Sequence, residues 1–292
     1  MSDFHLDRKQ VRRAFGRAAR SYEQHDVLQR EVQDRLLDRL DFYQEKPGRV
    51  LDLGAGTGRG SALLKKRYPK AEVIALDLAV PMLREVKKHA SWRRPLHRVC
   101  ASATQLPLPD HSIDVLHSNL CIQWCDDPAG LFAECARVLK PGGFLAATSF
   151  GPDTLRELRA AWAETDGGPH VGRFLDMHDL GDAMIVAGLR DPVLDVDRYT
   201  LTYAEPTALL RDLKGLGATN ADAARRRGLT GKARYQRMLD TYESLRVDGR
   251  IPATWEVVTL HAWGPPTGQP RRAPGGGEIA SFSIDQLRRS RR

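Results

Sequence analysis

Val50-Leu51-Asp52-Leu53-Gly54-Ala55-Gly56-Thr57-Gly58-Arg59 is the segment that most clearly indicates the fold of this chain. An apolar run of strand type, which starts at Arg49, leads directly into three glycines at alternate positions. A helical pattern follows, with Leu63 and Leu64 on its inner side. Strand, glycine turn and helix in this order are typical of an open α/β sheet with a nucleotide pocket at the carboxyl end of its first strand. Glycine suits the turn because a side chain would keep the ligand from the backbone and because such turns visit positive φ.

The spacing of the three glycines indicates which ligand the loop takes. A dinucleotide fingerprint reads G-x-G-x-x-G, and Arg59 stands where its last glycine would be. Asp52, on the strand before the loop, would repel a pyrophosphate but attract an ammonium group. The loop residues Gly54, Gly56 and Gly58 with Asp52 therefore predict S-adenosylmethionine, which carries an amino acid group and a sulfonium.

A second acid supports this interpretation. Residues 71–76 form the second predicted strand, and Asp77 ends it, about twenty residues beyond the loop, where a ribose-binding acid is expected. Its carboxylate could accept hydrogen bonds from both ribose hydroxyls. The alternative role for Asp77 is to cap the helix that follows at residues 81–83.

Composition and charge narrow the class of protein. The 292 residues contain 41% hydrophobic and 28% charged side chains, as in soluble globular proteins. No apolar run approaches the roughly 18 residues of a membrane helix, and the charged first twenty residues lack a signal core, so we expect a cytoplasmic protein with no membrane partner. The net charge of +8 favours an acidic partner or a nucleic acid.

The four cysteines predict no metal centre. Cys100, Cys121, Cys125 and Cys135 form no C-x-x-C pair, and we expect buried free thiols. Their spacing relative to His117 matches no common zinc pattern.

Strands and helices alternate along most of the chain. Further strands are predicted at residues 96–100, 113–118, 144–150, 193–203 and 254–263, with helices before, between and after them. This alternation predicts an α/β fold with a doubly wound, mostly parallel, seven-stranded sheet. We expect an N-terminal helical lid over residues 1–45 and a cofactor-binding α/β domain over residues 46–264. A helical cap inserted between the late strands would occupy about 152–188 and 204–250, and residues 265–292 would form a disordered basic tail.

Several stretches, read together, resemble one family. Three that carry the resemblance are Phe15-Gly16-Arg17-Ala18-Ala19 with Ser21-Tyr22-Glu23, Ser118-Asn119-Leu120 with Gln123-Trp124-Cys125, and Leu213-Lys214-Gly215-Leu216-Gly217-Ala218-Thr219. With the glycine loop, they resemble class I S-adenosylmethionine-dependent methyltransferases, and within these the malonyl-acyl-carrier-protein O-methyltransferases of biotin synthesis. The similarity extends from about Val11 to Trp263.

The resemblance implies methyl transfer to the free carboxylate of a malonyl thioester on acidic acyl carrier protein or on coenzyme A. It implies further cofactor contacts at Leu78, Met82, Ser102, Ala103 and Asn119; Ser102 stands where many members carry Asp. Tyr22, Gln123 and Trp124 would line the methyl-transfer site. Arg156 and Arg173, with Arg159 and Lys214 as further candidates, would anchor the substrate carboxylate through paired hydrogen bonds.

Three alternatives remain at this point. The first is a methyltransferase of the same fold that acts on a quinone or another carboxylate; a carbon acid would need a base, for which His117 and His178 are candidates. The second is a cofactor-binding assembly factor for respiratory complexes. The third is an RNA methyltransferase, which the absence of an Asn-Pro-Pro-Tyr type motif after residue 118 argues against. We therefore expect no nucleic-acid partner.

Overall fold

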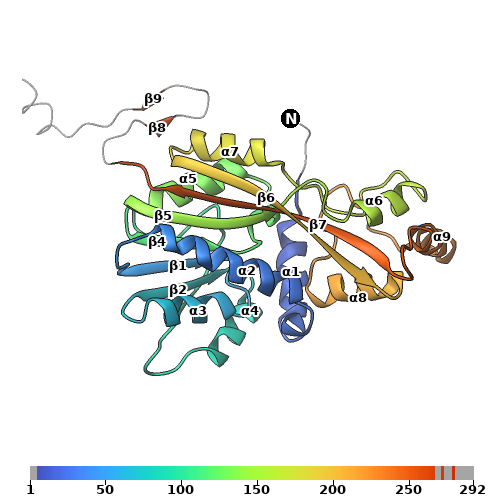
Figure 1. Cartoon of the computed structure of the whole chain (residues 1–292), viewed down its shortest axis with the longest axis horizontal. Coiled ribbons are helices and arrows are strands. Elements are labelled where there is room, and N and C mark those ends of the chain that lie inside the picture. Colours follow the sequence, from blue (N-terminus) through green and yellow to red (C-terminus); the bar gives the residue numbers. More distant parts are fainter. Residues whose placement is uncertain (1–4, 267–270, 273–277, 280–292) are drawn as a thin grey trace, which may run out of the picture.

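A single seven-stranded sheet forms the centre of the molecule (Figure 1). The computed structural model describes residues 5–266, 271–272 and 278–279. The strand order is β3-β2-β1-β4-β5-β7-β6; the first five strands are parallel, and β7 is antiparallel to both of its neighbours. The strands are β1 (Arg49–Leu53), β2 (Glu72–Asp77), β3 (His97–Cys100), β4 (Ile113–Ser118), β5 (Leu139–Phe150), β6 (Arg190–Tyr203) and β7 (Ile251–Trp263). The predicted doubly wound, mostly parallel sheet is confirmed.

Helices cover both faces of the sheet because alternate side chains of each strand point to opposite sides. Val50 and its neighbours on one face pack against α2, α3 and α4, whereas Leu51 and its neighbours pack against α5 and α7. The chain order reverses between β1 and β4, which leaves a crevice at the carboxyl ends of these strands. The helices of these two layers are α2 (Val27–Arg39), α3 (Arg59–Arg67), α4 (Val80–Glu85), α5 (Pro128–Val138) and α7 (Met177–Val186).

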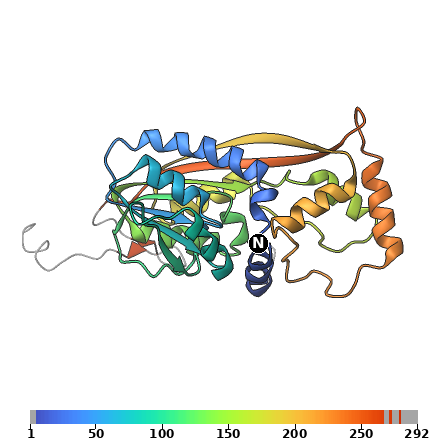
Figure 2. The same cartoon turned by 90° about the horizontal axis from the view of Figure 1, so that it is seen from below.

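The cap is built on an extension of the sheet. Strands β6 and β7, of 14 and 13 residues, pair along nearly their whole length and continue beyond the other strands (Figures 1 and 2). Helices α6 (Arg156–Ala163), α8 (Pro206–Gly215) and α9 (Lys232–Glu243) pack around their far ends. The range expected for the cap also included α7, but Leu180 and Met184 of α7 lie in the core of the sheet.

Strand boundaries differ from the predictions where the chain was expected to turn. Strand β5 begins at Leu139 and not at residue 144, because Leu139 pairs with Ile113 and a register shift carries the proline-glycine segment into the strand. Strand β7 begins at Ile251 and not at residue 254. The four cysteines are free as expected, but Cys100 is exposed and only Cys135 is fully buried.

The N-terminal elements lie between the two halves of the molecule. Helix α1 (Arg8–Ala18) stands at the boundary between sheet and cap, and the short 3-10 helix η1 (Tyr22–Gln24) leads from it to α2 (Figure 2). At the other end, β8 (Arg271–Arg272) pairs with β9 (Glu278–Ile279); the rest of the expected disordered tail lies outside the described residues. No helix of the described part is long and apolar enough to span a bilayer.

Candidate active site

The glycine loop presents bare backbone to a cavity. Gly54 and Gly56 have φ of 73° and 55°, in the left-handed region that favours glycine. The amides of Gly54 and Ala55 donate to the carbonyl of Leu76, at 2.8 and 3.0 Å, and so hold the loop against the end of β2. A Cβ on Gly54 would lie 2.4 Å from the Sγ of Cys121, whereas a Cβ on Gly56 would meet no atom within 4 Å. A ligand could therefore approach the backbone at Gly56.

This cavity is large and mostly apolar. Its empty volume is about 840 Å³, open mouth included, which is the size of a small-molecule site. The carboxyl ends of β1, β2 and β4 form its floor, and α1 and η1 form its roof. Predicted site residues that line it are Tyr22, Gly54, Gly56, Asp77, Leu78, Met82, Ser102, Ala103, Asn119 and Trp124.

A smaller, polar pocket adjoins the first. Tyr22, Gly54, Gly56 and Asn119 line both pockets. Further residues of the polar pocket are Asp26, Gln29, Arg30, Gln33, Asp52 and Arg59. The Oε1 atom of Gln29 is buried there without a hydrogen-bond partner in the protein. The two pockets together therefore offer one apolar and one charged compartment to a single ligand.

Asp52 lies at the base of the polar pocket and is only 2% exposed. Its Oδ2 accepts a hydrogen bond from the Ser61 hydroxyl at 2.6 Å, and its Oδ1 lies 2.9 Å from Nδ1 of the buried His117. His117 thus stands behind Asp52 on β4. His178, with its side chain 83% exposed on α7, lines neither pocket. Neither histidine is placed to act as a base on a ligand in the larger cavity.

Asp77 both ends β2 and holds the glycine loop. Its two oxygens accept hydrogen bonds from the amides of Gly56, at 2.9 Å, and Ala79, at 2.8 Å. Burial raises the pKa of its carboxyl group to about 6, although these two amides act in the opposite direction. The alternative role as a helix cap is not observed, because Ala79 is the N-cap of α4 and no side chain caps that helix. Asp77 instead bonds to the Ala79 amide in the preceding turn and lines the cavity.

Aromatic and amide side chains from several elements complete the enclosure of the cavity. The Phe15 ring of α1 packs edge-on against Trp124, with ring centroids 5.0 Å apart. Burial, followed by the charges of Asp26 and Asp77, raises the pKa of the Tyr22 phenol, so Tyr22 is neutral at physiological pH and can donate a hydrogen bond. Asn119 donates to the carbonyl of Gln29 at 3.0 Å, which ties the end of β4 to α2.

Several predicted site residues lie outside the lining of both pockets. Arg156 and Arg173 are exposed, and Arg156 lies 3.4 Å from Glu157. Arg159 donates to three backbone carbonyls of the cap, which indicates a structural role. The structure therefore does not bring the arginines of the cap to the cavity. Gly58, Gln123 and Lys214 are also absent from the lining residues.

The expected N-terminal lid did not specify which residues of α1 reach the cavity. Arg8, Val11 and Phe15 line the larger cavity, as do Cys121 and Cys125. The signal was present, because Val11 and Phe15 share one face of a helix whose other faces are charged. The Ser102 hydroxyl lies 2.9 Å from the Thr104 hydroxyl at the cavity wall. Within the part of the chain described, no group of three or more His, Cys, Asp or Glu side chains could hold a metal ion.

Comparison with known proteins agrees with this architecture. A family model described as a methyltransferase domain matches residues 51–147. The YcgJ protein of Bacillus subtilis has the same fold, with a TM-score of 0.56 and 16% identity over 79% of this chain and 97% of that one. An S-adenosylmethionine-dependent methyltransferase structure from Thermotoga maritima aligns with a TM-score of 0.51 and 19% identity over 87% of this chain and 99% of that one.

Full-length relatives decide the family. A malonyl-[acyl-carrier protein] O-methyltransferase of Xylella fastidiosa is 47% identical over 97% of this chain and 96% of its own length. The protein of that name from Halorhodospira halophila is 49% identical over 98% of this chain and 97% of its own length. The chain belongs to the malonyl-[acyl-carrier protein] O-methyltransferase family. It is therefore an S-adenosylmethionine-dependent O-methyltransferase of class I architecture.

The pockets fit the cofactor of this family. The open backbone at Gly56, the unpartnered Gln29 oxygen and the acids of the polar pocket match a ligand with an ammonium group at one end. The apolar cavity beside Asp77 matches a nucleoside at the other. Two basic side chains also line the polar pocket. Arg30 forms an ion pair with Asp26, and Arg59 forms one with Asp34.

Proposed function

We propose that this protein transfers a methyl group from S-adenosylmethionine to the free carboxylate of a malonyl thioester carried on acyl carrier protein. The observation that carries this proposal is the near-full-length similarity to enzymes of that name, in a chain whose lid and glycine loop enclose a two-part cavity. The methyl ester hides a charge, so that the chain can enter fatty-acid elongation on the way to biotin. We place the reaction in the cytoplasm, where free cysteines are stable.

The cavity suggests a role for each cofactor-binding residue. We propose that Asp77 accepts hydrogen bonds from the ribose and that Leu78, Met82, Ser102 and Ala103 surround the adenine. The amino acid end would lie in the polar pocket, against Gln29 and the carboxylates of Asp26 and Asp52. Gly54 and Gly56, which line both pockets, would lie beneath the junction of these two parts, and Gly58 would keep the loop in shape.

The chemistry requires little beyond positioning. S-adenosylmethionine, when bound, supplies a methyl group on a sulfonium, which is already an activated donor. A malonyl carboxylate is ionised at neutral pH, so the protein needs no general base. The protein must align the carboxylate and exclude water, and well-aligned systems gain roughly 7–11 kcal/mol from such positioning. The apolar walls from Phe15 and Trp124 serve the exclusion of water.

The hydrogen-bond donor for the substrate carboxylate is proposed to be Tyr22. Its phenol stays protonated, and the side chain lines both pockets, where the reacting ends of cofactor and substrate would meet. Trp124 would contact the thioester side. Gln123 donates to the carbonyl of Leu120 at 2.8 Å, and we assign it the support of the loop after β4. Arg156 and Arg173 would reach a substrate only at the surface.

The test is incubation of the pure protein with methyl-labelled S-adenosylmethionine and malonyl-carrier protein. We expect base-labile label on the carrier, and none with acetyl-carrier protein, which has no free carboxylate. Succinyl-carrier protein measures how strictly the cavity selects the chain length of the acid. Absence of label on the malonyl form, with cofactor binding intact, would refute the proposal.

A further inference from the structure

Helix α1 carries an unusual density of positive charge. Between residues 8 and 20 the chain has no acidic residue and six basic ones, which are Arg8, Lys9, Arg12, Arg13, Arg17 and Arg20. All six are exposed. Among the described ion pairs, only Arg8 of this set has a partner, Asp126 at 3.0 Å. The other five cations contribute no salt bridge to the fold in the part of the chain described.

This charge works against the helix that carries it. Arg8 and Arg12, Lys9 and Arg13, and Arg13 and Arg17 are four residues apart, and each such like-charged pair destabilises a helix by about 0.2–0.5 kcal/mol. Cations in the first turn also oppose the helix dipole. Apart from Arg8, these cations cost stability and form no ion pair among the described residues, which calls for a role outside the folded chain.

The two faces of α1 have different surroundings. Val11 and Ala18 are buried, and Val11 and Phe15 line the larger cavity. At about 100° per residue, Lys9, Arg13 and Arg17 lie on the opposite face. Helix α1 stands at the boundary between sheet and cap, where Figure 2 shows it projecting from the body of the molecule. One helix thus forms a wall of the cavity and a cationic outer surface.

A second basic segment lies beside the start of α1. Leu6 pairs with Asp222, the amide of Ala223 donates to the carbonyl of His5 at 2.8 Å, and Arg225 lies 2.9 Å from Asp7. These contacts place the exposed Arg226 and Arg227 next to the N-terminus of α1. Leu229, two residues further, is 94% exposed and could contact an apolar spot on a partner.

We propose that the cationic face of α1, extended by Arg226 and Arg227, is the docking surface for an acidic carrier protein. The inference rests on the proposed function, because a thioester on a protein can reach the cavity only if that protein binds beside its mouth. The charge of the face complements an acidic partner and would speed its encounter. A single-stranded nucleic acid is less well suited, since Lys9, Arg13 and Arg17 have no exposed aromatic ring beside them on α1 on which bases could stack.

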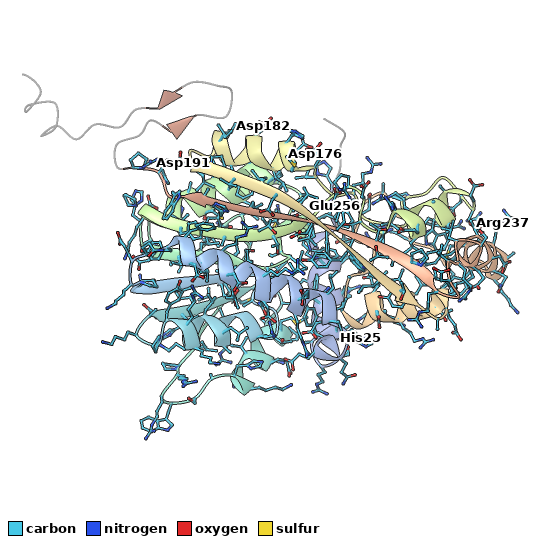
Figure 3. The ribbon with its side chains drawn as sticks, in the orientation of Figure 1. His25, Asp176, Asp182, Asp191, Arg237 and Glu256 are labelled. Atoms are coloured by element: carbon cyan, nitrogen blue, oxygen red, sulfur yellow. The ribbon has the colours of Figure 1, made fainter. Side chains whose placement is uncertain are left out.

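The experiment compares two double variants with the same change in charge. The first is Arg13→Glu with Arg17→Glu; it turns the repulsion between positions 9 and 13 into an attraction and leaves like charges at positions 13 and 17, so the fold is expected to persist. The control is Lys232→Glu with Arg237→Glu, on exposed positions of α9 at the far end of the cap, where Figure 3 marks Arg237. Each variant is assayed with malonyl-carrier protein and with malonyl-pantetheine, which has the reacting group but neither the protein nor the phosphates.

We expect kcat/KM for malonyl-carrier protein to fall by about 10- to 100-fold in the α1 variant at low ionic strength. Activity with malonyl-pantetheine and the Kd for S-adenosylmethionine should change less than twofold, as should both activities of the α9 control. Added salt should lower kcat/KM of the unaltered enzyme for the carrier substrate and have little effect on the variant.

Three outcomes would overturn the docking surface. These are an unchanged kcat/KM of the α1 variant for the carrier substrate, an equal loss in the α9 control, and an equal loss with malonyl-pantetheine. Loss of RNA binding with unchanged carrier kinetics would assign the face to a nucleic acid instead. If the unaltered enzyme methylates neither malonyl substrate, the proposed function fails, which is a different result from a failure of docking alone.

Discussion

At the scale of single residues, the acids of the site are placed for different tasks. Asp52 is buried and held by Ser61 and His117, whereas Asp77 faces the cavity with both oxygens already bonded to backbone amides. Asp52 therefore lines the polar pocket with a side chain that these two contacts hold in place. Asp77 can change its protonation within the experimental pH range, and the occupancy of the site should follow it.

Cofactor affinity should depend on pH through Asp77. Burial raises the pKa of its carboxyl group to about 6, above the value of about 3.9 in an unfolded chain. With this raised pKa, the Asp77 carboxyl adds to the free energy of unfolding below pH 4. This added stability is lost as the pH rises through about 6. Ribose hydroxyls donate hydrogen bonds to the ionised Asp77 carboxylate. The Kd for S-adenosylmethionine should therefore be about tenfold larger at pH 5 than at pH 7. Calorimetric titration at both pH values measures it.

The matched variant for this prediction is Asp77→Asn. It should bind the cofactor more weakly at pH 7 and show little change of Kd between pH 5 and 7. A pH dependence as steep as that of the unaltered protein would assign the titration to another group.

Tyr22 provides a second test at this scale. In Tyr22→Phe the ring remains and the proposed donor to the substrate carboxylate is lost. A hydrogen bond to a charged group contributes about 1.5–3 kcal/mol, so we expect kcat/KM for the malonyl substrate to fall by about 10- to 100-fold. The Kd for S-adenosylmethionine should change less than threefold. Equal losses in cofactor binding and in kcat/KM would show that the hydroxyl serves the cofactor instead.

At the scale of elements, the lid depends on the cap for its position. The Ser21 hydroxyl donates to the carbonyl of Gly215 at 3.0 Å, and Nδ1 of His25 lies 2.9 Å from Asp212. These contacts hold η1, which carries Tyr22, against the end of α8; His25 is marked in Figure 3. The family resemblance identified both segments, but their contact joins parts of the chain 194 residues apart.

Substitution of Gly215 tests this contact. A Cβ on Gly215 would lie 2.2 Å from the His25 ring, so Gly215→Ala must displace His25 from Asp212 and shift η1. Such overpacking costs about 1–3 kcal/mol, and we expect the Kd for S-adenosylmethionine to rise by about 5- to 50-fold. Hydrogen exchange of residues 21–26 should speed up. In Gly167→Ala, where a Cβ meets nothing within 4 Å, both quantities should stay unchanged; unchanged binding in Gly215→Ala would exclude the coupling.

At the scale of the whole molecule, the long β6–β7 ribbon joins two hydrophobic cores. Val258 and Leu260 of β7 belong to the core of the sheet, whereas Ile251, Trp255 and Val257 belong to that of the cap. Glu256, which Figure 3 labels, lies on β7 near the boundary between these two cores, and it is 6% exposed. Its carboxylate accepts from the amide of Asp153 at 2.8 Å and from Arg198 at 3.0 Å.

Loss of the Glu256 carboxylate should weaken the joint between sheet and cap. Glu256→Ala leaves the Asp153 amide without its acceptor, and we expect the free energy of unfolding to fall by about 1–3 kcal/mol in urea denaturation. Glu31→Ala is the control, because its exposed pair with Arg35 four residues away contributes about 0.3–0.5 kcal/mol. A loss in Glu256→Ala no larger than that of the control would contradict this role.

Local sequence patterns were enough to predict the sheet and the glycines and acids beneath the cavity. Alternation of apolar residues predicted the strands, and the glycines with Asp52 and Asp77 predicted where a ligand would approach, because these signals depend on neighbouring residues. The positions of the N-terminal helices and of the cap relative to the cavity came from tertiary contacts. It brought Val11 and Phe15 of α1 to the cavity, left Arg156 and Arg173 at the surface, and built the cap on the β6–β7 ribbon. These arrangements depend on pairings between segments far apart in the chain, and no local pattern of residues encodes them.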